Sequence, residues 1–308
     1  MSIPASLATP LKDQLTARFG VAAGTNVEYS IDQRPDVHSV TLPLGGYPRY
    51  QIADAGAAMS LGGSWSMAVA RLIDAILPPT MLLRIDSDRN GLFALTSYLR
   101  FQQEPGIERF CQLIERICHL PTNPAQLTAV TTALGCTGPR GIGLRGSTDG
   151  SIRLAVYFKV ERDLSSFSAD TVGTLLTGCG WDCAGAPAIQ ADLRAVHVGG
   201  SVGVIGVDLD ASGAIAALKC DPTNVPLHRV STFLQQKRAA AERLDVFGRM
   251  SRALRARSLS YLGIKYTPQG FAGWRLYFSL RPDGHARLAQ PALFIDSPGA
   301  ATLRMPHY

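Results

Sequence analysis

The segment Ile142–Val160, IGLRGSTDGSIRLAVYFKV, decides the fold of this chain. Apolar residues stand eight and six positions before Gly150, and the three residues directly before that glycine are the turn formers Ser, Thr and Asp. Glycine adopts a positive φ without steric cost, so Gly150 suits a tight turn. After the turn, every second residue from Ile152 to Val160 is apolar. The segment therefore predicts a β-hairpin that turns at Gly150.

The same spacing recurs in three other segments, Leu83–Gly91, Ile205–Gly213 and Leu262–Gly270. The four turn glycines lie 59, 63 and 57 residues apart. Similarity at such a period indicates one supersecondary unit that is used repeatedly. A fifth hairpin is predicted from Asn26–Asp32, which turns at residues 34–36 into Val37–Leu42. Five hairpins provide ten antiparallel strands.

Helical patterns fill the gaps between the hairpins. Apolar residues recur at helical spacing, for example at Ile107, Phe110, Ile114 and Ile117. The predicted helices are Ala5–Phe19, Ser66–Leu77, Gly106–Leu120, Ala169–Leu176 and Arg238–Arg257. The repeated unit is therefore a hairpin followed by a helix, an αββα pattern that makes the chain α+β.

The second strand of each hairpin has one polar and one apolar face. Residues of one parity, counted from the turn glycine, are mostly apolar and are expected to meet the helices. The other parity carries Tyr98, Tyr157 and Tyr277 at plus seven, and Arg100 and Lys159 at plus nine. We expect the sheet to close into a ten-stranded antiparallel barrel with a polar lumen, because an open sheet would leave two unpaired edges. Ordinary cross-strand pairs on a solvated face are the alternative.

A closed lumen would concentrate positive charge. We expect Arg100, Lys159, Lys219 and Arg275 to face it, with Arg84, Arg145 and Lys265 on the facing strands; Lys219 stands only six residues after its turn glycine. Arginine and lysine in a partly desolvated space favour an anion such as a diphosphate. The faces of Tyr98, Tyr157 and Tyr277 can stabilise a carbocation. Together, these features favour the ionisation of an allylic diphosphate.

The first hairpin carries a carboxylate. Glu28 alternates with Ser30 and Asp32 on one strand, and His38 follows the turn on the partner strand. A carboxylate among cations can accept a proton from an attacking nucleophile. The alternative is that Glu28 is an ordinary surface residue.

Composition and motifs exclude several classes of function. The 308 residues are 46% hydrophobic, which excludes disorder, and no apolar run reaches the roughly 20 residues of a membrane span. The N-terminus lacks a secretion signal, so a cytoplasmic protein is expected. The six cysteines form no C-x-x-C pair, which argues against zinc. The net charge of +6 includes no run of five like charges, which argues against nucleic-acid binding. No D-D-x-x-D run and no P-loop is present, so no cofactor is expected to be obligatory, while a role for magnesium stays open.

These residues resemble the ABBA-fold prenyltransferases, especially the dimethylallyltryptophan synthase type and the cyanobactin peptide prenyltransferases. The segment Glu28–Asp32 looks like the E-x-S-x-N strand of that family, with Asp where many members have Asn. The pairs Tyr98–Arg100, Tyr157–Lys159 and Arg275–Tyr277, and the cation at Lys219, look like its diphosphate-binding patterns. His38 stands where the family usually has Arg.

The resemblance implies one prenyltransferase barrel over residues 1–308. It further implies dimethylallyl diphosphate as donor and an aromatic or peptide acceptor. In this reading, Glu28 is the general base, Arg100, Lys159, Lys219, Arg275 and His38 bind the diphosphate, and Tyr98, Tyr157 and Tyr277 shield the cation. The donor could also be a geranyl diphosphate. Two other functions remain: a non-catalytic barrel that binds an anionic metabolite or an acidic peptide, and a phosphate-handling hydrolase that uses His38 or His197.

Overall fold

The computed structural model describes residues 27–34, 36–44, 52, 56, 61–79, 81–163, 167–196 and 202–280. Over these ranges, five antiparallel hairpins follow one another along the chain. The strands are β1 (Val27–Asp32) with β2 (His38–Leu44), β3 (Met81–Asp88) with β4 (Gly91–Arg100), β5 (Gly141–Ser147) with β6 (Ile152–Asp163), β7 (Val202–Leu209) with β8 (Ile215–Asp221), and β10 (Ser258–Thr267) with β11 (Gly270–Leu280). The short strand β9 (Thr223–Pro226) follows β8 and pairs with β10.

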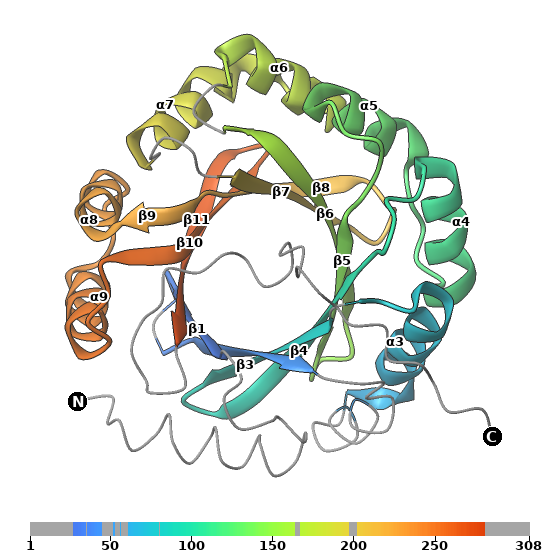
Figure 1. The fold of residues 1–308 in the computed structure, drawn as a ribbon, viewed down its shortest axis with the longest axis horizontal. Coiled ribbons are helices and arrows are strands. Elements are labelled where there is room, and N and C mark those ends of the chain that lie inside the picture. The colour runs from blue at the N-terminus through green and yellow to red at the C-terminus, as the bar shows by residue number, and fades with distance from the viewer. Residues whose placement is uncertain are drawn as a thin grey trace.

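The ten hairpin strands close into a barrel. Each strand pairs with the next, β8 pairs with β10, and β11 pairs both with β10 and with β1, so the described sheet closes on itself (Figure 1). The predicted ten-stranded antiparallel barrel is therefore confirmed, and the alternative of an open, solvated sheet is excluded. No helix of the described ranges is long and apolar enough to cross a bilayer.

The turn glycines behave as predicted. Gly91, Gly150, Gly213 and Gly270 have φ values of +118°, +82°, +84° and +105°, which residues with a Cβ rarely adopt. The first hairpin also matches the prediction within two residues at each strand end. The repeat is thus encoded locally, by the turns and by the alternation of the strands that flank them.

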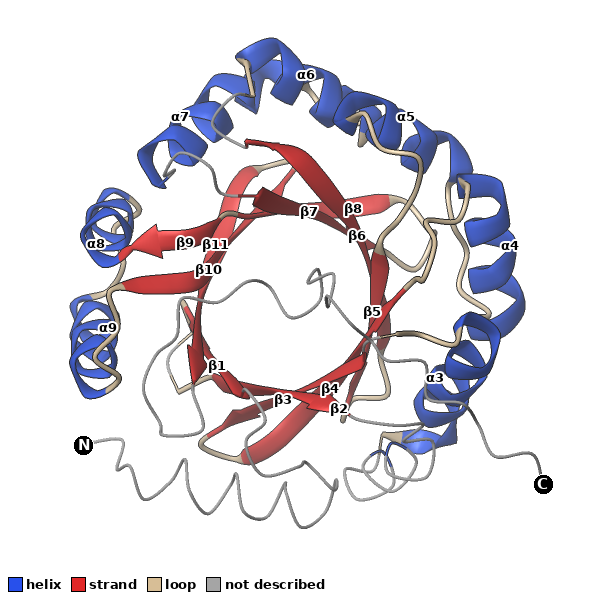
Figure 2. Cartoon of the chain, viewed as in Figure 1, coloured by secondary structure: helices blue, strands red, loops and turns tan. Residues whose placement is uncertain are grey.

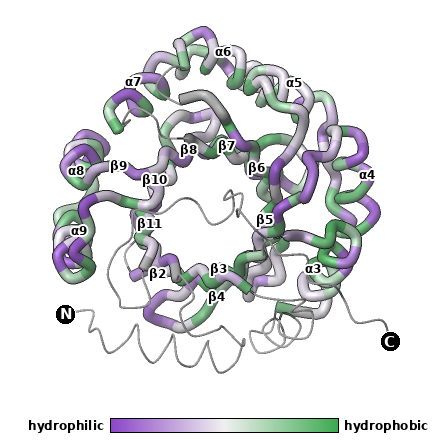
Figure 3. Tube along the Cα trace, in the orientation of Figure 1, coloured by the Kyte–Doolittle hydropathy of each residue, from purple (hydrophilic) through white to green (hydrophobic). Residues whose placement is uncertain are grey.

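Helices surround the barrel as a single outer layer (Figure 2). They are α3 (Gly62–Ile76), α4 (Ile107–Cys118), α5 (Pro124–Leu134), α6 (Ala169–Gly178), the short 3₁₀ helix η2 (Cys183–Gly185), α7 (Ala186–Val196), α8 (Leu227–Gln236) and α9 (Ala241–Ala253). The core lies between this layer and the outer face of the barrel, where residues such as Phe110 of α4 and Phe158 of β6 are fully buried. Hydropathy alternates along the strands and around the helices, as expected when each element has one buried face (Figure 3).

The helix predictions were partly correct. The expected helices at Ser66–Leu77, Gly106–Leu120 and Ala169–Leu176 correspond to α3, α4 and α6. The predicted helix Arg238–Arg257 is too long at both ends: Arg238 has a positive φ of 52° and separates α8 from α9, and α9 ends at Ala253, before Arg255 with a positive φ of 48°. Helices α5, α7 and α8 were not predicted. The expected helix Ala5–Phe19 and His197 lie outside the described residues.

Candidate active site

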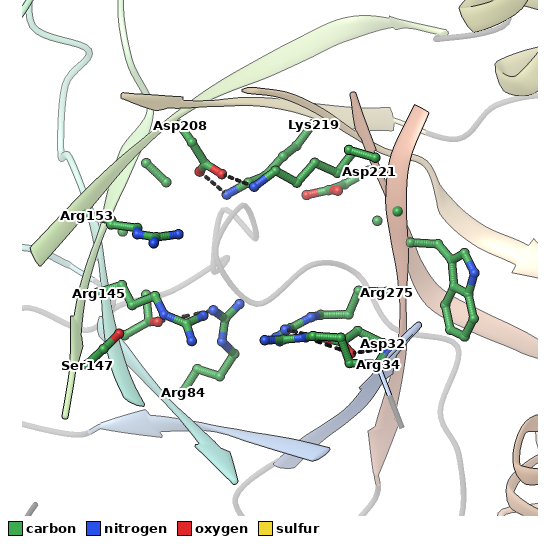
Figure 4. Close-up of a pocket in the computed structure, with 18 of the residues that line it drawn as sticks. Asp32, Arg34, Arg84, Arg145, Ser147, Arg153, Asp208, Lys219, Asp221 and Arg275 are labelled. Carbon is green, nitrogen blue, oxygen red and sulfur yellow. Dashed lines mark hydrogen bonds and ion pairs between the residues drawn. The ribbon is translucent and has the colours of Figure 1, made fainter. Parts of the chain in front are cut away.

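A cavity of about 490 Å³ occupies the barrel lumen toward the end where the hairpins turn. Turn residues such as Gln33, Thr148 and Asp149 line its mouth, and strand residues from β1, β3 to β8, β10 and β11 line its wall. This volume lies in the range of small-molecule sites. Figure 4 shows that charged side chains from opposite walls project into it.

The cavity is rich in cations. Among the described residues, seven cationic side chains line it: Arg34, Arg84, Arg145, Arg153, Lys219, Lys265 and Arg275. Five carboxyl groups lie on or directly behind the same wall: Asp32, Asp86, Asp149, Asp208 and Asp221. The excess of positive charge is held in a confined space, where an anion is attracted more strongly than in water.

Three of the arginines converge on Asp86, which is fully buried. Arg84, Arg145 and Arg275 place a nitrogen 3.0, 2.8 and 3.4 Å from its carboxylate oxygens, and the Ser39 hydroxyl donates a hydrogen bond of 2.6 Å. Burial alone would raise the pKa of Asp86, but the three guanidinium groups outweigh it and hold that pKa well below its usual range. One buried anion therefore fixes the position of three cations.

Asp208 and Asp32 organise the remaining cations in the same way. Lys219 and Lys265 both donate to Asp208, with 2.9 Å between Lys265 Nζ and Asp208 Oδ2. Asp32 accepts from Arg34 and from Arg275, the latter at 2.9 Å. Burial raises the pKa of Asp208, yet the two lysines bring it below its ordinary value. These ion pairs pre-organise the cations before any ligand binds.

Four tyrosines form a layer at the inner end of the cavity. This tyrosine layer consists of Tyr98, Tyr157, Tyr261 and Tyr277. The ring centroids are 5.8 Å apart in the Tyr98–Tyr157 pair and in the Tyr261–Tyr277 pair. Tyr98 accepts a hydrogen bond from Arg84, and Lys219 Nζ lies 5.4 Å from the centroid of Tyr157. The layer therefore joins the cations directly.

Glycines on the facing strands make room for these rings. A Cβ at Gly143 would lie 3.1 Å from Tyr98 and 3.2 Å from Tyr157, and one at Gly206 would lie 2.9 Å from Tyr157. The rings can therefore lie against the barrel wall and leave the lumen open. Both glycines stand seven residues before their turn glycine, as does Gly263.

Adding a methyl group at residue 206 should crowd Tyr157. We expect Gly206→Ala to push the ring into the lumen and to lower the free energy of unfolding by about 1–3 kcal/mol, the usual effect of overpacking. Denaturant unfolding measures this change. Gly63→Ala is the matched control, because a Cβ there meets nothing within 4 Å and alanine favours the helix. Equal stability of the two variants would contradict the crowding.

Two lumen carboxyl groups differ from the paired aspartates. Glu28 shares the inward face of β1 with Ser30 and Asp32 and accepts a hydrogen bond from Thr41, while Asp221 lies on the cavity wall. Burial raises the pKa of both groups to about 7. Each carboxyl can therefore exchange a proton near neutral pH, as general acid–base catalysis requires.

The raised pKa of Asp221 makes stability depend on pH. Its pKa is about 7 in the folded chain and about 4 in the unfolded chain. The folded chain thus binds more protons between these values, and stability is lost as the pH rises through that window. We expect Asp221→Asn to raise the melting temperature at pH 8 and to change it little at pH 4.

Asp208→Asn provides the opposite control, since the pKa of Asp208 is lowered by its lysines. This variant should be destabilised at pH 8, and the difference should shrink as the pH falls toward the folded pKa. Thermal unfolding from about pH 2.5 to pH 8 measures both variants, because the Asp208 difference shrinks only below the ordinary aspartate pKa of about 4. If the melting temperatures of the two variants changed with pH in the same way, the conclusion that Asp221 is buried without a paired cation would be wrong.

The cavity is lined by eight of the residues that the sequence analysis placed in the lumen. Lys219, Arg275, Tyr98, Tyr157 and Tyr277 all line it, and so do Arg84, Arg145 and Lys265 from the facing strands. Glu28 faces the lumen but is not among the cavity-lining residues. Lys219 reaches the cavity despite its different distance from Gly213, because the register of β7 and β8 shifts between Asp208 and Leu209.

Arg100 and Lys159 need a correction. Both share the inward parity of Tyr98 and Tyr157, but neither lines the cavity. Arg100 and Lys159 each follow a tyrosine of the layer by two residues, which advances the strand by about 6.6–6.8 Å. Their side chains therefore start one step beyond the tyrosine layer, farther from the hairpin turns. The prediction that they face the lumen agrees with the register, but they do not line the cavity that holds Lys219 and Arg275, and their role in diphosphate binding stays a prediction.

His38 also needs a correction, since it lies on the outer face of β2. It pairs with Ile31, a core residue between barrel and helices, and its Nδ1 lies 2.6 Å from the hydroxyl of Tyr29. Ser39, its neighbour, faces the lumen instead and binds Asp86. The expectation that His38 joins the lumen cations is therefore wrong.

The prediction from sequence missed the acidic half of the site. Asp86, Asp208 and Asp221, together with the mouth cations Arg34 and Arg153, were not named as lumen residues. A signal was present, because the position five residues before the turn glycine carries Asp86, Arg145, Asp208 and Lys265 in the four repeats. Charge of both signs at one inward position of a repeat indicates ion pairs across a lumen.

No metal-binding cluster appears in this part of the chain: the described residues hold no group of three or more His, Cys, Asp or Glu side chains placed to bind a metal ion. The six cysteines, all within those ranges, have free thiols.

Solved structures of prenyltransferases have the same architecture. The 6-dimethylallyltryptophan synthase from Micromonospora olivasterospora, in complex with DMASPP and Trp, matches with a TM-score of 0.59 at 15% identity, over 86% of this chain and 84% of its own. AnaPT from Neosartorya fischeri matches with a TM-score of 0.57 at 11% identity, over 88% and 82%. PriB, in a binary complex with product diphosphate, matches with a TM-score of 0.54 at 12% identity, over 87% and 82%.

No protein-family model matches the sequence, and no curated protein matches it. The structural matches show that the chain has the ABBA fold, the closed ten-stranded barrel of the aromatic prenyltransferases.

Proposed function

We propose that the chain is a prenyltransferase. It moves a dimethylallyl or geranyl group from its diphosphate to an aromatic or other nucleophilic side chain of an amino acid, a peptide or a small natural product. The observation that carries this proposal is the meeting of a cationic cavity with a layer of tyrosines inside one closed barrel. The fold shared with prenyltransferases supports it.

In this proposal the diphosphate binds among Arg84, Arg145, Lys219, Lys265 and Arg275. Arginine binds phosphate oxygens through two parallel hydrogen bonds, and lysine acts as a point charge. The cavity holds more cations than carboxylates, which suits a multiply charged anion. A diphosphate carries about three negative charges at neutral pH, because its phosphate pKa values lie below neutrality. These contacts strengthen as negative charge develops on the leaving group.

The tyrosine layer then faces the allylic carbon chain. The ring faces of Tyr98, Tyr157 and Tyr277 stabilise a carbocation by about 0.5–2 kcal/mol each and keep water from it. The acceptor attacks the cation and loses a proton to a lumen carboxylate. The sequence resemblance assigns this role to Glu28. Because the side chains supply the positive charge, transfer requires no metal, and magnesium would at most accompany the diphosphate.

The test is transfer of label from dimethylallyl or geranyl diphosphate. The purified chain is incubated with the labelled donor, with and without EDTA, and with a panel of aromatic amino acids, indoles and short peptides. Labelled product together with released diphosphate is expected, at a rate that EDTA does not abolish. Tight binding of the donor with no release of diphosphate would instead support a non-catalytic barrel that binds an anion.

A further inference from the structure

The tyrosine layer contains one acidic position. In three hairpins, the first-strand residue that stands nine positions before the turn glycine pairs with an inward-facing tyrosine of the second strand. These pairs are Leu82 with Tyr98, Gly141 with Tyr157 and Tyr261 with Tyr277. In the β7–β8 hairpin the same position is Asp221, which pairs with Val204. The β-bulge after Asp208 adds one residue to the distance between Gly213 and Asp221. For this reason the spacing in the sequence does not show that Asp221 is equivalent to the three tyrosines.

The geometry puts the Asp221 carboxylate among the tyrosine rings. A Cβ at Gly263 would lie 3.2 Å both from Asp221 Oδ1 and from the edge of Tyr277, so the carboxylate and the ring meet over this glycine. Asp221 also lines the cavity, two residues beyond Lys219 on the same face of β8. Figure 4 shows it on the same wall as Asp208 and Lys219. The carboxylate thus lies where the proposed function requires the allylic cation.

Asp221 is not needed to hold the cations. Within the ranges that the structure describes, Asp32, Asp86 and Asp208 each form ion pairs with two or more cations, whereas no ion pair joins Asp221 to a cation. Glu28 differs as well, because it accepts a hydrogen bond from Thr41 and does not line the cavity. Asp149 also lines the cavity, but it lies in the exposed hairpin turn at the mouth and accepts from the Ser151 N–H. On the described strands, Asp221 is therefore the carboxylate that lines the cavity and forms no ion pair with a cation.

We propose that Asp221, in place of the Glu28 that the sequence resemblance indicates, is the group that accepts the proton lost by the prenyl acceptor. This inference rests on the proposed function. The C–O bond of the donor breaks, and its electron pair leaves with the diphosphate. A new bond forms from an electron pair of the acceptor to the allylic carbon. The proton on the attacked atom passes to the Asp221 carboxylate and later to solvent through the cavity mouth.

The charged and titratable groups that face Asp221 come from six strands: Glu28 of β1, Arg84 of β3, Asp208 of β7, Lys219 of β8, Tyr261 of β10, and Arg275 and Tyr277 of β11. The cations favour its ionised form, while Asp208 and burial oppose it, which leaves its pKa at about 7. This balance suits a group that must take up a proton and release it in each cycle.

The experiment compares the full-length wild type with Asp221→Asn, Asp221→Glu, Glu28→Gln and Asp245→Asn. The last variant removes an exposed carboxylate that pairs only along α9 in the described structure. Dimethylallyl diphosphate is the donor, L-tryptophan and a panel of indoles are the acceptors, and transfer is followed from pH 5.5 to 9. Calorimetric titration with inorganic diphosphate shows that each variant is folded and binds the anion.

Asp221→Asn is expected to slow transfer at least 100-fold, in the range of general acid–base effects, and to bind diphosphate as tightly as the wild type or more tightly. The loss of rate below about pH 7 should disappear with it. Asp221→Glu should restore much of the rate, and Glu28→Gln should keep the pH dependence of the wild type. Asp245→Asn should behave as the wild type.

Two outcomes would overturn this assignment while the proposed function stands. One is transfer within threefold of the wild type in Asp221→Asn, with the pH dependence lost in Glu28→Gln instead. The other is a fall in the acceptor-free hydrolysis of the donor by Asp221→Asn that is as large as its fall in transfer. This result would show that Asp221 acts on the ionisation of the donor and not on the proton of the acceptor. A wild type that releases no diphosphate with any acceptor would contradict the proposed function, and the assignment with it.

Discussion

Replacing Asp86 by asparagine should destabilise the chain by about 3–5 kcal/mol, the cost of removing one partner from a buried ion pair. The carboxylate is fully buried, and three guanidinium groups converge on it within 3.4 Å. Asparagine is similar in shape and can still accept from Ser39, so no cavity forms. The cost arises because Arg84, Arg145 and Arg275 keep their charges and lose the anion that holds them together. Thermal and denaturant unfolding at pH 7 measure it.

Diphosphate should partly restore the stability of Asp86→Asn. Its arginines line the cavity, so a bound anion can replace the lost negative charge. Diphosphate at 100 times its Kd would return about 2.7 kcal/mol by mass action. Asp192→Asn is the matched control. Asp192 is also buried, with Lys237 at 2.6 Å and Tyr266 at 2.8 Å, but it lies outside the lumen on α7. Asp192→Asn should also be destabilised, but at the same fixed diphosphate concentration it should gain less than Asp86→Asn, because its lumen keeps the Asp86 charge and binds the anion less tightly. Equal gains would contradict a diphosphate site built on Asp86.

The sequence predicted the barrel because its determinants are local. A turn glycine at a fixed distance from alternating strands specifies each hairpin, and the parity of Tyr98, Tyr157 and Tyr277 specifies their face. Closure followed from the need to pair the edges. Helix α5 was missed because it has only a weak amphipathic pattern, with several small residues and threonines in its eleven positions.

The depth of a residue in the lumen could not be predicted in this way. Parity separates the two faces of a strand, but the position along the barrel axis depends on strand tilt and on register across all ten strands. Arg100 and Lys159 therefore have the expected face but lie outside the lining of the cavity that holds Lys219 and Arg275. His38 was misplaced for a related reason, since its face depends on the number of residues in the first turn, which pairs it with Ile31. Asp221 was missed because one bulge shifted its repeat position.

The second large effect concerns donor affinity. We expect the double substitution Lys219→Met and Arg275→Met to weaken the binding of dimethylallyl diphosphate and of inorganic diphosphate by about 10²–10⁴-fold, because each charged hydrogen bond contributes about 1.5–3 kcal/mol. The chain should still fold, since Asp208 keeps Lys265, and Asp32 keeps Arg34. Calorimetric titration at fixed salt gives the Kd of each variant, and the Asp86 pairs of Arg84 and Arg145 are left intact.

Two comparisons make this result specific to the cavity. Lys237→Met removes a lysine that pairs with a buried aspartate outside the lumen, and it should leave the Kd unchanged. The double variant Arg100→Met and Lys159→Met removes the same number of charges as Lys219→Met and Arg275→Met, from the same inward face but beyond the tyrosine layer. Because Coulomb attraction falls with distance and is screened by salt, we expect it to change the Kd by less than about tenfold. A loss as large as that of Lys219→Met with Arg275→Met would move the diphosphate to the other end of the lumen and reverse the orientation of the donor.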